Sequence, residues 1–143
     1  MPELRLRALQ LLTRRDYSRA ELQARLAAAA ESAEQLEALL DALQSERLLS
    51  DSRYAVQRVS ARAGRYGNAR LRQELRQKGV DDEEIAAALF VGGDECERCR
   101  AVWARKFGVL PESAGERARQ TRFLQYRGFS GEAIRQVMAG ADE

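Results

Sequence analysis

Two cysteines three residues apart are the one arrangement in this sequence with the spacing of a catalytic or metal-binding motif. Cys96 and Cys99 stand in the stretch CERC, and the 143 residues contain no other cysteine and no histidine. A zinc site would need two more ligands, which could only be carboxylates. A redox motif of the thioredoxin type needs a strand leading into it, and none is predicted. Spacings of three and four instead place both cysteines with Trp103 and Phe107 on one apolar helix stripe. A redox switch stays an alternative, and it predicts activity that changes with dithiothreitol.

The rest of the sequence offers little that could carry out a reaction. The absence of histidine removes the commonest general base, the commonest metal ligand and every Ser–His or Cys–His pair. No GxxxxGK[ST] stretch is present to bind nucleotide phosphates. Carboxylate pairs are frequent, but they fall on faces of helices that are expected to meet solvent. We therefore expect a protein that is not an enzyme and that needs no cofactor or metal.

A phrase of fifteen residues occurs three times and shows which elements organise the chain. It reads LTRRDYSRAELQARL from Leu12, LRQKGVDDEEIAAAL from Leu75 and LQYRGFSGEAIRQVM from Leu124. Each copy has a large residue, then Ser or Asp, then apolar residues four and eight positions further on. These positions are Tyr17, Val80 and Phe129; Ser18, Asp81 and Ser130; Leu22, Ile85 and Ile134; Leu26, Leu89 and Met138.

The phrase is typical of a helix, a tight turn and a second helix. Ser and Asp are preferred N-caps, and spacings of four keep apolar residues on one helix face. Gly79 and Gly128 stand where a helix C-terminus favours a left-handed residue, and Asp16 takes that place in the first copy. A fainter echo runs through Leu43 and Leu48 to Asp51. Three copies indicate an internal repeat that stacks into an elongated body.

The predicted fold is all-α, with about nine short helices in three tandem three-helix repeats that form an elongated and curved body. Ser18, Asp51, Asn68, Asp81 and Asp94 are the predicted caps of the second, fourth, fifth, sixth and seventh helices. The helices are expected over residues 4–13, 18–30, 34–47, 51–63, 68–78, 81–90, 94–107, 116–127 and 130–139. The repeats are expected over 1–50, 51–93 and 94–143, although the phrase joins different helices in the first repeat and in the other two.

No alternating β-branched run predicts a strand. No apolar stretch approaches the roughly 20 residues of a membrane span, and the N-terminus lacks a signal-peptide core. We expect a cytoplasmic protein that is a monomer.

Charge is strongly segregated although the net charge is only +2. Residues 52–80 carry eight basic side chains against Glu74, while acidic stretches flank them on both sides. A basic stretch of this kind is suited to bind a polyanion, because the guanidinium group of arginine can donate two hydrogen bonds to phosphate and an aromatic ring can stack on a base. The alternative is a solvated face that balances the acidic neighbours. On the fourth helix Tyr54, Arg58, Arg62 and Arg65 are expected along one flank, and on the fifth Arg72 and Arg76. The full candidate set is Arg53, Tyr54, Arg58, Arg62, Arg65, Tyr66, Arg70, Arg72, Arg76, Lys78, Arg122 and Arg127.

The stretch LLSDSRYAVQRVSARAGRYGNARLRQELRQKGV, residues 48–80, resembles the signature of the RecX family, bacterial regulators of the RecA recombinase. RFLQYRGFSGEAI near the C-terminus and RALQLLTRRDYSRAEL near the N-terminus are also similar to that family. The sequence departs from the pattern at Arg65, where Gly usually precedes Tyr-Gly, and at Asn68, where Pro usually begins the helix. Asn68 should preserve the fold, since Asn caps a helix as Pro begins one. Arg65 adds a charge at that turn.

The resemblance implies an all-helical protein of three repeats that lies along the groove of a RecA filament on single-stranded DNA. It implies inhibition of strand exchange, ATP turnover and filament growth, and so a role in DNA repair and recombination without catalysis or a cofactor. Which face would meet the recombinase and which the DNA stays open. A helix-turn-helix regulator that prefers one duplex sequence is the alternative, because short helices with Gly turns and arginine-rich faces also describe that class.

Overall fold

The computed structural model describes residues 2–140, and these form nine α-helices and one short 3₁₀ helix without a strand. The all-α prediction is therefore confirmed for the described part of the chain. The elements are α1 (Pro2–Arg14), α2 (Arg19–Leu26), η1 (Ala27–Ala29), α3 (Ala33–Ser45), α4 (Asp51–Arg62), α5 (Asn68–Gln77), α6 (Asp82–Val91), α7 (Glu95–Lys106), α8 (Ala114–Tyr126) and α9 (Gly131–Met138).

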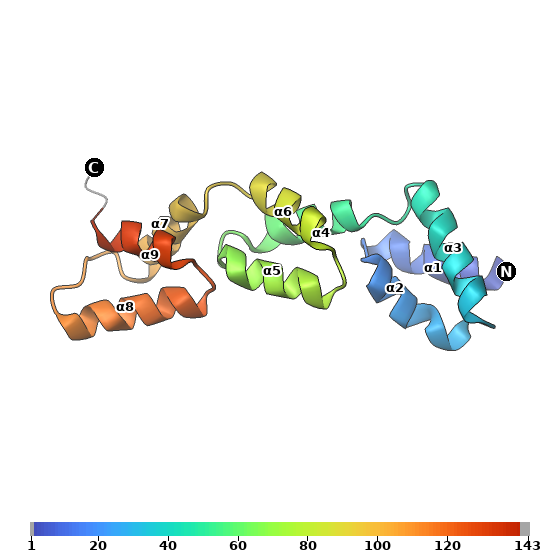
Figure 1. The fold of residues 1–143 in the computed structure, drawn as a ribbon, viewed down its shortest axis with the longest axis horizontal. Coiled ribbons are helices and arrows are strands. Elements are labelled where there is room, and N and C mark those ends of the chain that lie inside the picture. The colour runs from blue at the N-terminus through green and yellow to red at the C-terminus, as the bar shows by residue number, and fades with distance from the viewer. Residues whose placement is uncertain (1, 141–143) are drawn as a thin grey trace.

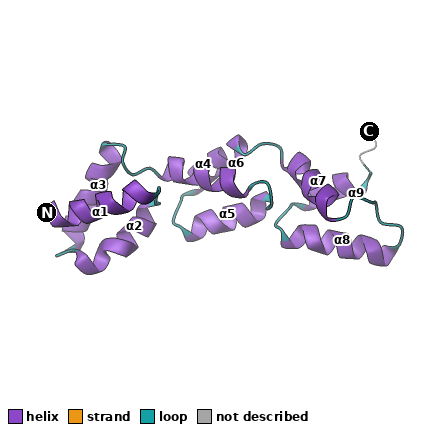
Figure 2. Cartoon of the chain, turned by 180° about the vertical axis from the view of Figure 1, so that it is seen from behind, coloured by secondary structure: helices purple, strands orange, loops and turns teal. Residues whose placement is uncertain are grey.

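The helices stand in three groups of three along one line, with the first and last groups at opposite ends of an elongated molecule (Figure 1). We call α1–α3 the first unit, α4–α6 the second and α7–α9 the third. In the second and third units the first helix packs chiefly on the last, α4 on α6 and α7 on α9. The middle helix, α5 or α8, lies beside that pair (Figure 2). In the first unit α2 contacts both α1 and α3.

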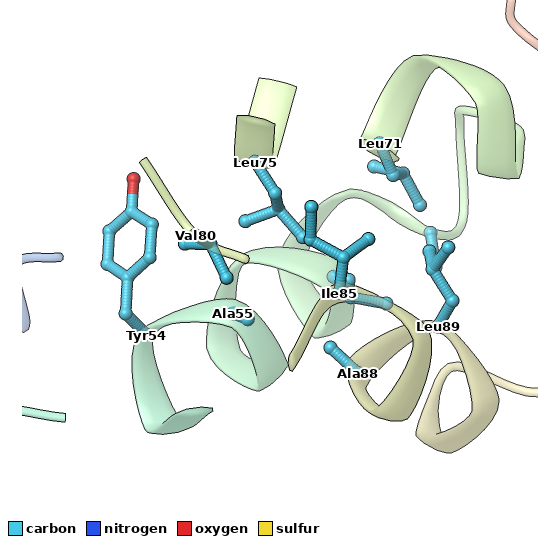
Figure 3. Packing of buried hydrophobic residues seen from close by; sticks show 10 residues of the cluster. Tyr54, Ala55, Leu71, Leu75, Val80, Ile85, Ala88 and Leu89 are labelled. Atoms are coloured by element: carbon cyan, nitrogen blue, oxygen red, sulfur yellow. The ribbon is translucent and has the colours of Figure 1, made fainter. Parts of the chain in front are cut away.

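Each unit has a hydrophobic core of its own. Leu22 and Leu40 lie in the first core, Leu71 and Ile85 in the second, and Leu124 in the third. Figure 3 shows the second core, where Leu71 and Leu75 of α5 point toward the side chains of α4 and α6. The repeated apolar positions that follow the turn, from Tyr17, Val80 and Phe129 onward, are buried in every copy, with none more than 6% exposed. Stability therefore arises within each small unit, because a short helix is marginal until its apolar face packs.

Two of the predicted glycine turns have the expected geometry. Gly79 and Gly128 have φ values of 82° and 91°. Each turn closes with a hydrogen bond from the next amide to the carbonyl five residues earlier, Val80 to Leu75 at 3.1 Å and Phe129 to Leu124 at 3.2 Å. This is the Schellman pattern that satisfies the last carbonyls of a helix.

The first copy of the phrase turns differently from the prediction. Asp16 has no positive φ. Its carboxylate instead accepts a hydrogen bond from Arg53 Nε at 3.0 Å, across to the second unit. The left-handed position belongs to the fainter echo after α3, where Arg47 has a φ of 65° and the Leu48 amide donates to the Leu43 carbonyl at 2.9 Å.

Replacing Arg47 by glycine is expected to stabilise the protein. A residue with a Cβ is strained by about 1–2 kcal/mol in the left-handed region, and glycine relieves this strain at some cost in chain entropy. We expect Arg47→Gly to raise the free energy of unfolding of the first unit by up to about 1 kcal/mol, measured by urea denaturation. An unchanged or lower stability would show that the Arg47 side chain stabilises the turn by more than its backbone strain.

The units are joined by hydrogen bonds that recur at equivalent positions. At the first junction, between the first and second units, Ser18 Oγ donates to the Lys78 carbonyl at 2.7 Å. The Arg19 amide donates to Asp51 Oδ1, also at 2.7 Å. The N-cap and first residue of α2 thus hold the α5–α6 turn and the start of α4. Ser18 also caps α2 by accepting from the Glu21 amide at 3.1 Å.

The second junction, between the second and third units, repeats this arrangement with α5 in place of α2. The Gly67 amide donates to the Arg127 carbonyl at 2.8 Å, and the Asn68 amide donates to Glu95 Oε2 at 2.9 Å. Gly67 and Gly128 approach so closely that a Cβ on Gly67 would overlap the Gly128 carbonyl. Glycine at position 67 is therefore required by contact with the next unit, since its own φ of −86° is ordinary.

Two predicted caps lie one residue inside their helices. Ser50, rather than Asp51, caps α4 by accepting from the Arg53 amide at 3.0 Å. Gly67, rather than Asn68, occupies the N-cap position of α5. The side chains of Asp51 and Asn68 are engaged at the two junctions instead.

Candidate nucleic-acid and partner interface

Five arginines gather where the second unit meets the third, around the ring of Tyr66 and the carboxylate of Glu74. α4 supplies two of them, the α4–α5 turn and α5 supply one each, and the last comes from the α8–α9 turn. We call this group the central arginine cluster. Its members are Arg58, Arg62, Arg65, Arg70 and Arg127.

Glu74 anchors the cluster from α5. Arg62 binds it in a bidentate pair, with Nε and a terminal nitrogen each 2.8 Å from a carboxylate oxygen. The Nε atoms of Arg70 and Arg58 lie 3.6 and 3.8 Å from the same carboxylate. The hydrogen bond to Glu74 is the main cause of a raised pKa of Arg62. One partly buried anion, with a side chain 17% exposed, therefore orients three cations.

Tyr66 forms the second support of the cluster. The guanidinium carbons of Arg62 and Arg70 each lie 4.5 Å from the ring centroid, with Arg127 at 5.4 Å and Arg65 at 5.7 Å. Cations at these distances are attracted to an aromatic face. The ring is partly buried against the second core. Tyr66 therefore holds guanidinium groups in place, and its faces are occupied by them.

Three candidate residues belong to the first junction instead. Arg53 pairs with Asp16, and Lys78 Nζ lies 3.6 Å from a Glu21 oxygen. Tyr54 is only 4% exposed and belongs to the second core, so its expected place on the exposed flank of α4 is wrong. A buried ring cannot stack on a base, because no face is open to a ligand.

The remaining three candidates lie apart from the cluster. Arg72 is two residues from Arg70 on α5, which rotates it by about 200° around the helix axis to the other flank. Arg76 lies on that flank with it and pairs with Asp82 at 3.1 Å. Arg122 is exposed on α8, one turn before Tyr126. The fifth helix therefore presents two separate basic edges.

The geometry of the cluster suits a polyanion. The cluster holds five guanidinium groups and one carboxylate, that of Glu74, which leaves a local excess of positive charge. The side chains of Arg58, Arg62 and Arg70 are 25–35% exposed, so their charges are partly shielded from water and still accessible. The planar guanidinium group of arginine can donate two parallel hydrogen bonds to the oxygens of one phosphate.

Tyr126 is a residue of this face that the candidate set lacks. It is 78% exposed at the end of α8, and the Arg70 guanidinium lies 5.9 Å from its ring centroid. The sequence places it directly before Arg127, in YRGF. Because the hydrophobic period of α8 does not require it in the third core, that position marks it as an exposed aromatic among basic residues.

The two cysteines form part of the third core, as the apolar stripe predicts. Cys99 is fully buried, and Cys96 and Trp103 pack against the same cluster. Cys96 Sγ donates to Gln136 Oε1 at 2.9 Å. Burial raises the pKa of the Cys99 thiol to about 12. Among residues 2–140 no group of three or more metal-ligating side chains could hold an ion.

Alkylation of the native protein is expected to distinguish the two thiols. At pH 8 a thiol with a pKa near 12 is almost entirely protonated, and the thiolate is the nucleophile. We expect iodoacetamide to modify Cys96 while Cys99 reacts at least about a thousandfold more slowly than an exposed thiol. Peptide mapping measures both rates, and both cysteines should react together in urea. Rapid reaction of Cys99 in the folded protein would contradict its burial.

No helix within the described range 2–140 is both long enough and apolar enough to cross a membrane. The fold and the arginine face together define a class: an elongated helical-repeat protein with a surface suited to bind a polyanion. Models of the second and third three-helix domains of RecX match residues 50–89 and 93–138. The chain belongs to the RecX family of regulatory proteins, since these matches cover more than half of it.

Relatives across the whole length agree with this assignment. The chain is 48% identical over 137 residues to the regulatory protein RecX of Chromobacterium violaceum, covering 96% of this chain and 90% of the relative. It is 46% identical to that of Ralstonia pickettii over 143 residues, covering 98% and 89%.

Two crystal structures share the fold. RecX from Lactobacillus salivarius superposes with a TM-score of 0.86 at 20% identity, covering 99% of this chain and 96% of that one. A second regulatory protein RecX gives 0.83 at 22% identity, covering 96% and 72%.

Proposed function

We propose that this protein regulates the RecA recombinase by binding the filament that RecA forms on single-stranded DNA. It lies along the filament groove as a monomer in the cytoplasm and inhibits ATP hydrolysis, strand exchange and filament growth. It performs no bond chemistry. The inhibition comes from binding energy alone, because a ligand that binds one filament state better than another shifts the population toward it.

The observation that carries this proposal is the central arginine cluster, placed where the second and third units meet in an elongated member of the RecX family. A rod of three units can contact several subunits of a helical polymer at once. The cluster offers a phosphate-binding site at the second junction. The units on both sides of this junction offer other surfaces for contact with protein. The acidic stretches at both sides of the cluster suit basic patches on a protein partner.

The test is recombinase ATP hydrolysis on single-stranded DNA, titrated with this protein below and up to stoichiometric amounts. Hydrolysis should fall as the protein is added. Arg65→Glu with Arg127→Glu reverses two charges in the cluster and should raise the half-inhibitory concentration at least tenfold. Full inhibition by this variant would remove the cluster from the interface.

Arg72→Glu with Arg76→Glu is the matched control, since it makes the same change in charge on the opposite edge of α5. Equal losses in both variants would indicate attraction by overall charge rather than a defined face. Binding to unrelated duplexes at stated salt separates a helix-turn-helix regulator from this proposal, because phosphate contacts make affinity depend on salt. A strong preference for one duplex, with no effect on the recombinase, would overturn the proposal.

A further inference from the structure

A groove beside the central arginine cluster has features that phosphate binding alone does not explain. It has a volume of about 530 Å³ and lies between α5 and the end of α8. Arg70 and Glu74 line its side toward the cluster, and Tyr126 lines the other. Three glutamines complete the polar lining: Gln73, Gln77 and Gln125.

Tyr126 is the unusual member of this groove. The chain has four tyrosines, and Tyr17 and Tyr54 are each 4% exposed while Tyr66 is packed against the second core. Tyr126 is 78% exposed, so its ring contributes little to the stability of α8. The backbone beneath it is held, since the Tyr126 carbonyl accepts from Arg70 at 3.4 Å. The fold thus places a large aromatic face in solvent on a fixed support.

Arg70 links this ring to the rest of the site. Its guanidinium lies 4.5 Å from the Tyr66 centroid and 5.9 Å from that of Tyr126, and its Nε lies 3.6 Å from Glu74. A fixed cation therefore stands beside the open ring. An aromatic or guanidinium plane stacks on any nucleobase, and nearby amide groups can bond to base edges.

We propose that this groove binds a base of single-stranded nucleic acid, with Tyr126 as the stacking platform and the arginine cluster holding the adjacent phosphates. The inference rests on the proposed function and adds a base-contact site to it. A single strand is favoured over a duplex because the bases of a duplex are already paired and stacked on one another, so they offer no free face to the Tyr126 ring. A nucleic acid is favoured over a protein partner because the lining is polar, with only Ala69 and Gly128 as small apolar members.

The test compares Tyr126→Ala and Tyr126→Phe in binding to a fluorescent oligothymidylate, followed by anisotropy at several salt concentrations. Loss of one stacked base should weaken binding by about 5- to 100-fold in Tyr126→Ala. Tyr126→Phe keeps the ring and should bind like the parent protein. The salt dependence should be unchanged in both variants, because neither removes a charge. Equal binding by Tyr126→Ala and the parent protein would overturn the proposal.

An oligonucleotide of abasic sites separates stacking from phosphate contact. It keeps every phosphate, so the parent protein and Tyr126→Ala should bind it equally. If Tyr126→Ala binds it more weakly than the parent protein does, the ring acts without a base and the proposal fails. Photo-crosslinking with 5-iododeoxyuridine should attach the strand to Tyr126, both when the strand is free and when it is bound in the recombinase filament.

A failure here is distinguishable from a failure of the proposed function. If Tyr126→Ala binds DNA normally but loses inhibition of the recombinase, the ring contacts protein and the base site is wrong. If the parent protein does not inhibit the recombinase but its DNA binding follows the predicted pattern, the base site stands and the regulatory role fails.

Discussion

Replacing Gly67 by alanine is expected to open the junction between the second and third units without unfolding either. The new Cβ would overlap the Gly128 carbonyl, and no side-chain rotation can relieve this overlap, because a Cβ is fixed by its own backbone and the carbonyl is backbone. Overpacking of this kind costs about 1–3 kcal/mol. Because each unit has its own core, this cost should appear as separation of the units rather than as lost helicity.

Hydrogen exchange measures this result directly. The amides of Gly67 and Ala69 donate to carbonyls of the third unit, at 2.8 and 3.1 Å, and not to carbonyls of their own helix. Their protection therefore reports the junction alone. In Gly67→Ala, exchange at Ala69 should accelerate at least tenfold. Gly64→Ala is the matched control, since a Cβ at Gly64 meets no atom within 4 Å. Unchanged protection of Ala69 in Gly67→Ala would show that the units can shift apart without breaking these bonds.

Glu74→Ala is expected to destabilise the second unit and to make its stability depend on added anions. Without the carboxylate, Arg62 loses a bidentate partner and the arginines around it repel one another. We expect the free energy of unfolding to fall by about 1–3 kcal/mol. Part of the loss should be recovered at 0.5 M salt, since salt screens repulsion between partly exposed charges.

Tripolyphosphate provides the decisive comparison. If the cluster binds phosphate oxygens, the anion should raise the melting temperature of Glu74→Ala more than that of the parent protein, because it replaces the lost carboxylate. Glu116→Ala is the control: it removes an exposed partner of Arg119 on α8 and should change stability by less than about 0.5 kcal/mol. Equal shifts in all three proteins would indicate that the polyanion binds without using the cluster.

The sequence predicts the helices well because their determinants are local. Caps, apolar spacings of four and left-handed glycines each act within one or two turns, and the repeated positions from Leu22 to Met138 are buried as expected. The third repeat of the phrase and the second even close with the same hydrogen bonds.

The errors fall on residues engaged between units. The sequence predicts Asp51 as the cap of α4 and Asp16 in a left-handed turn, but their carboxylates accept hydrogen bonds from Arg19 and Arg53 across the first junction. Asn68 was expected to cap α5, but its side-chain oxygen accepts from Arg98 at 3.0 Å. Asp and Asn are good caps in any sequence, so the local pattern cannot show that a distant unit uses them.

In the candidate site, too, the sequence predicts the features that are local and misses those that depend on contact between units. Charge segregation identifies the basic region, and Arg58, Arg62, Arg65 and Arg70 do gather. Arg127 joins them only because the α8–α9 turn contacts the start of α5, which no periodicity within one helix predicts. Tyr54 is buried because it packs in the second core. Tyr126 becomes relevant only when α8 is placed beside α5.

The second junction also contains a half-buried cation, Arg98. Arg98, at the start of α7, donates to the carbonyls of Ala63 and Tyr66, each at 3.0 Å. Burial lowers the pKa of Arg98, although arginine keeps its proton. Other hydrogen bonds also cross this junction, including those from Arg105 to the Gly64 carbonyl at 2.8 Å and from Arg127 to the Arg65 carbonyl at 3.1 Å. The hydrophobic cores, in contrast, each lie within one unit.

In a molecule built in this way, each unit is held rigid by its own core, and the junctions between units deform more easily. If it is bound to a polymer that lengthens or twists, the deformation is concentrated at the two junctions, while the three units keep their shape. The protein can then stay bound to a polymer whose helical pitch changes, because hydrogen bonds at a junction break before the whole molecule dissociates.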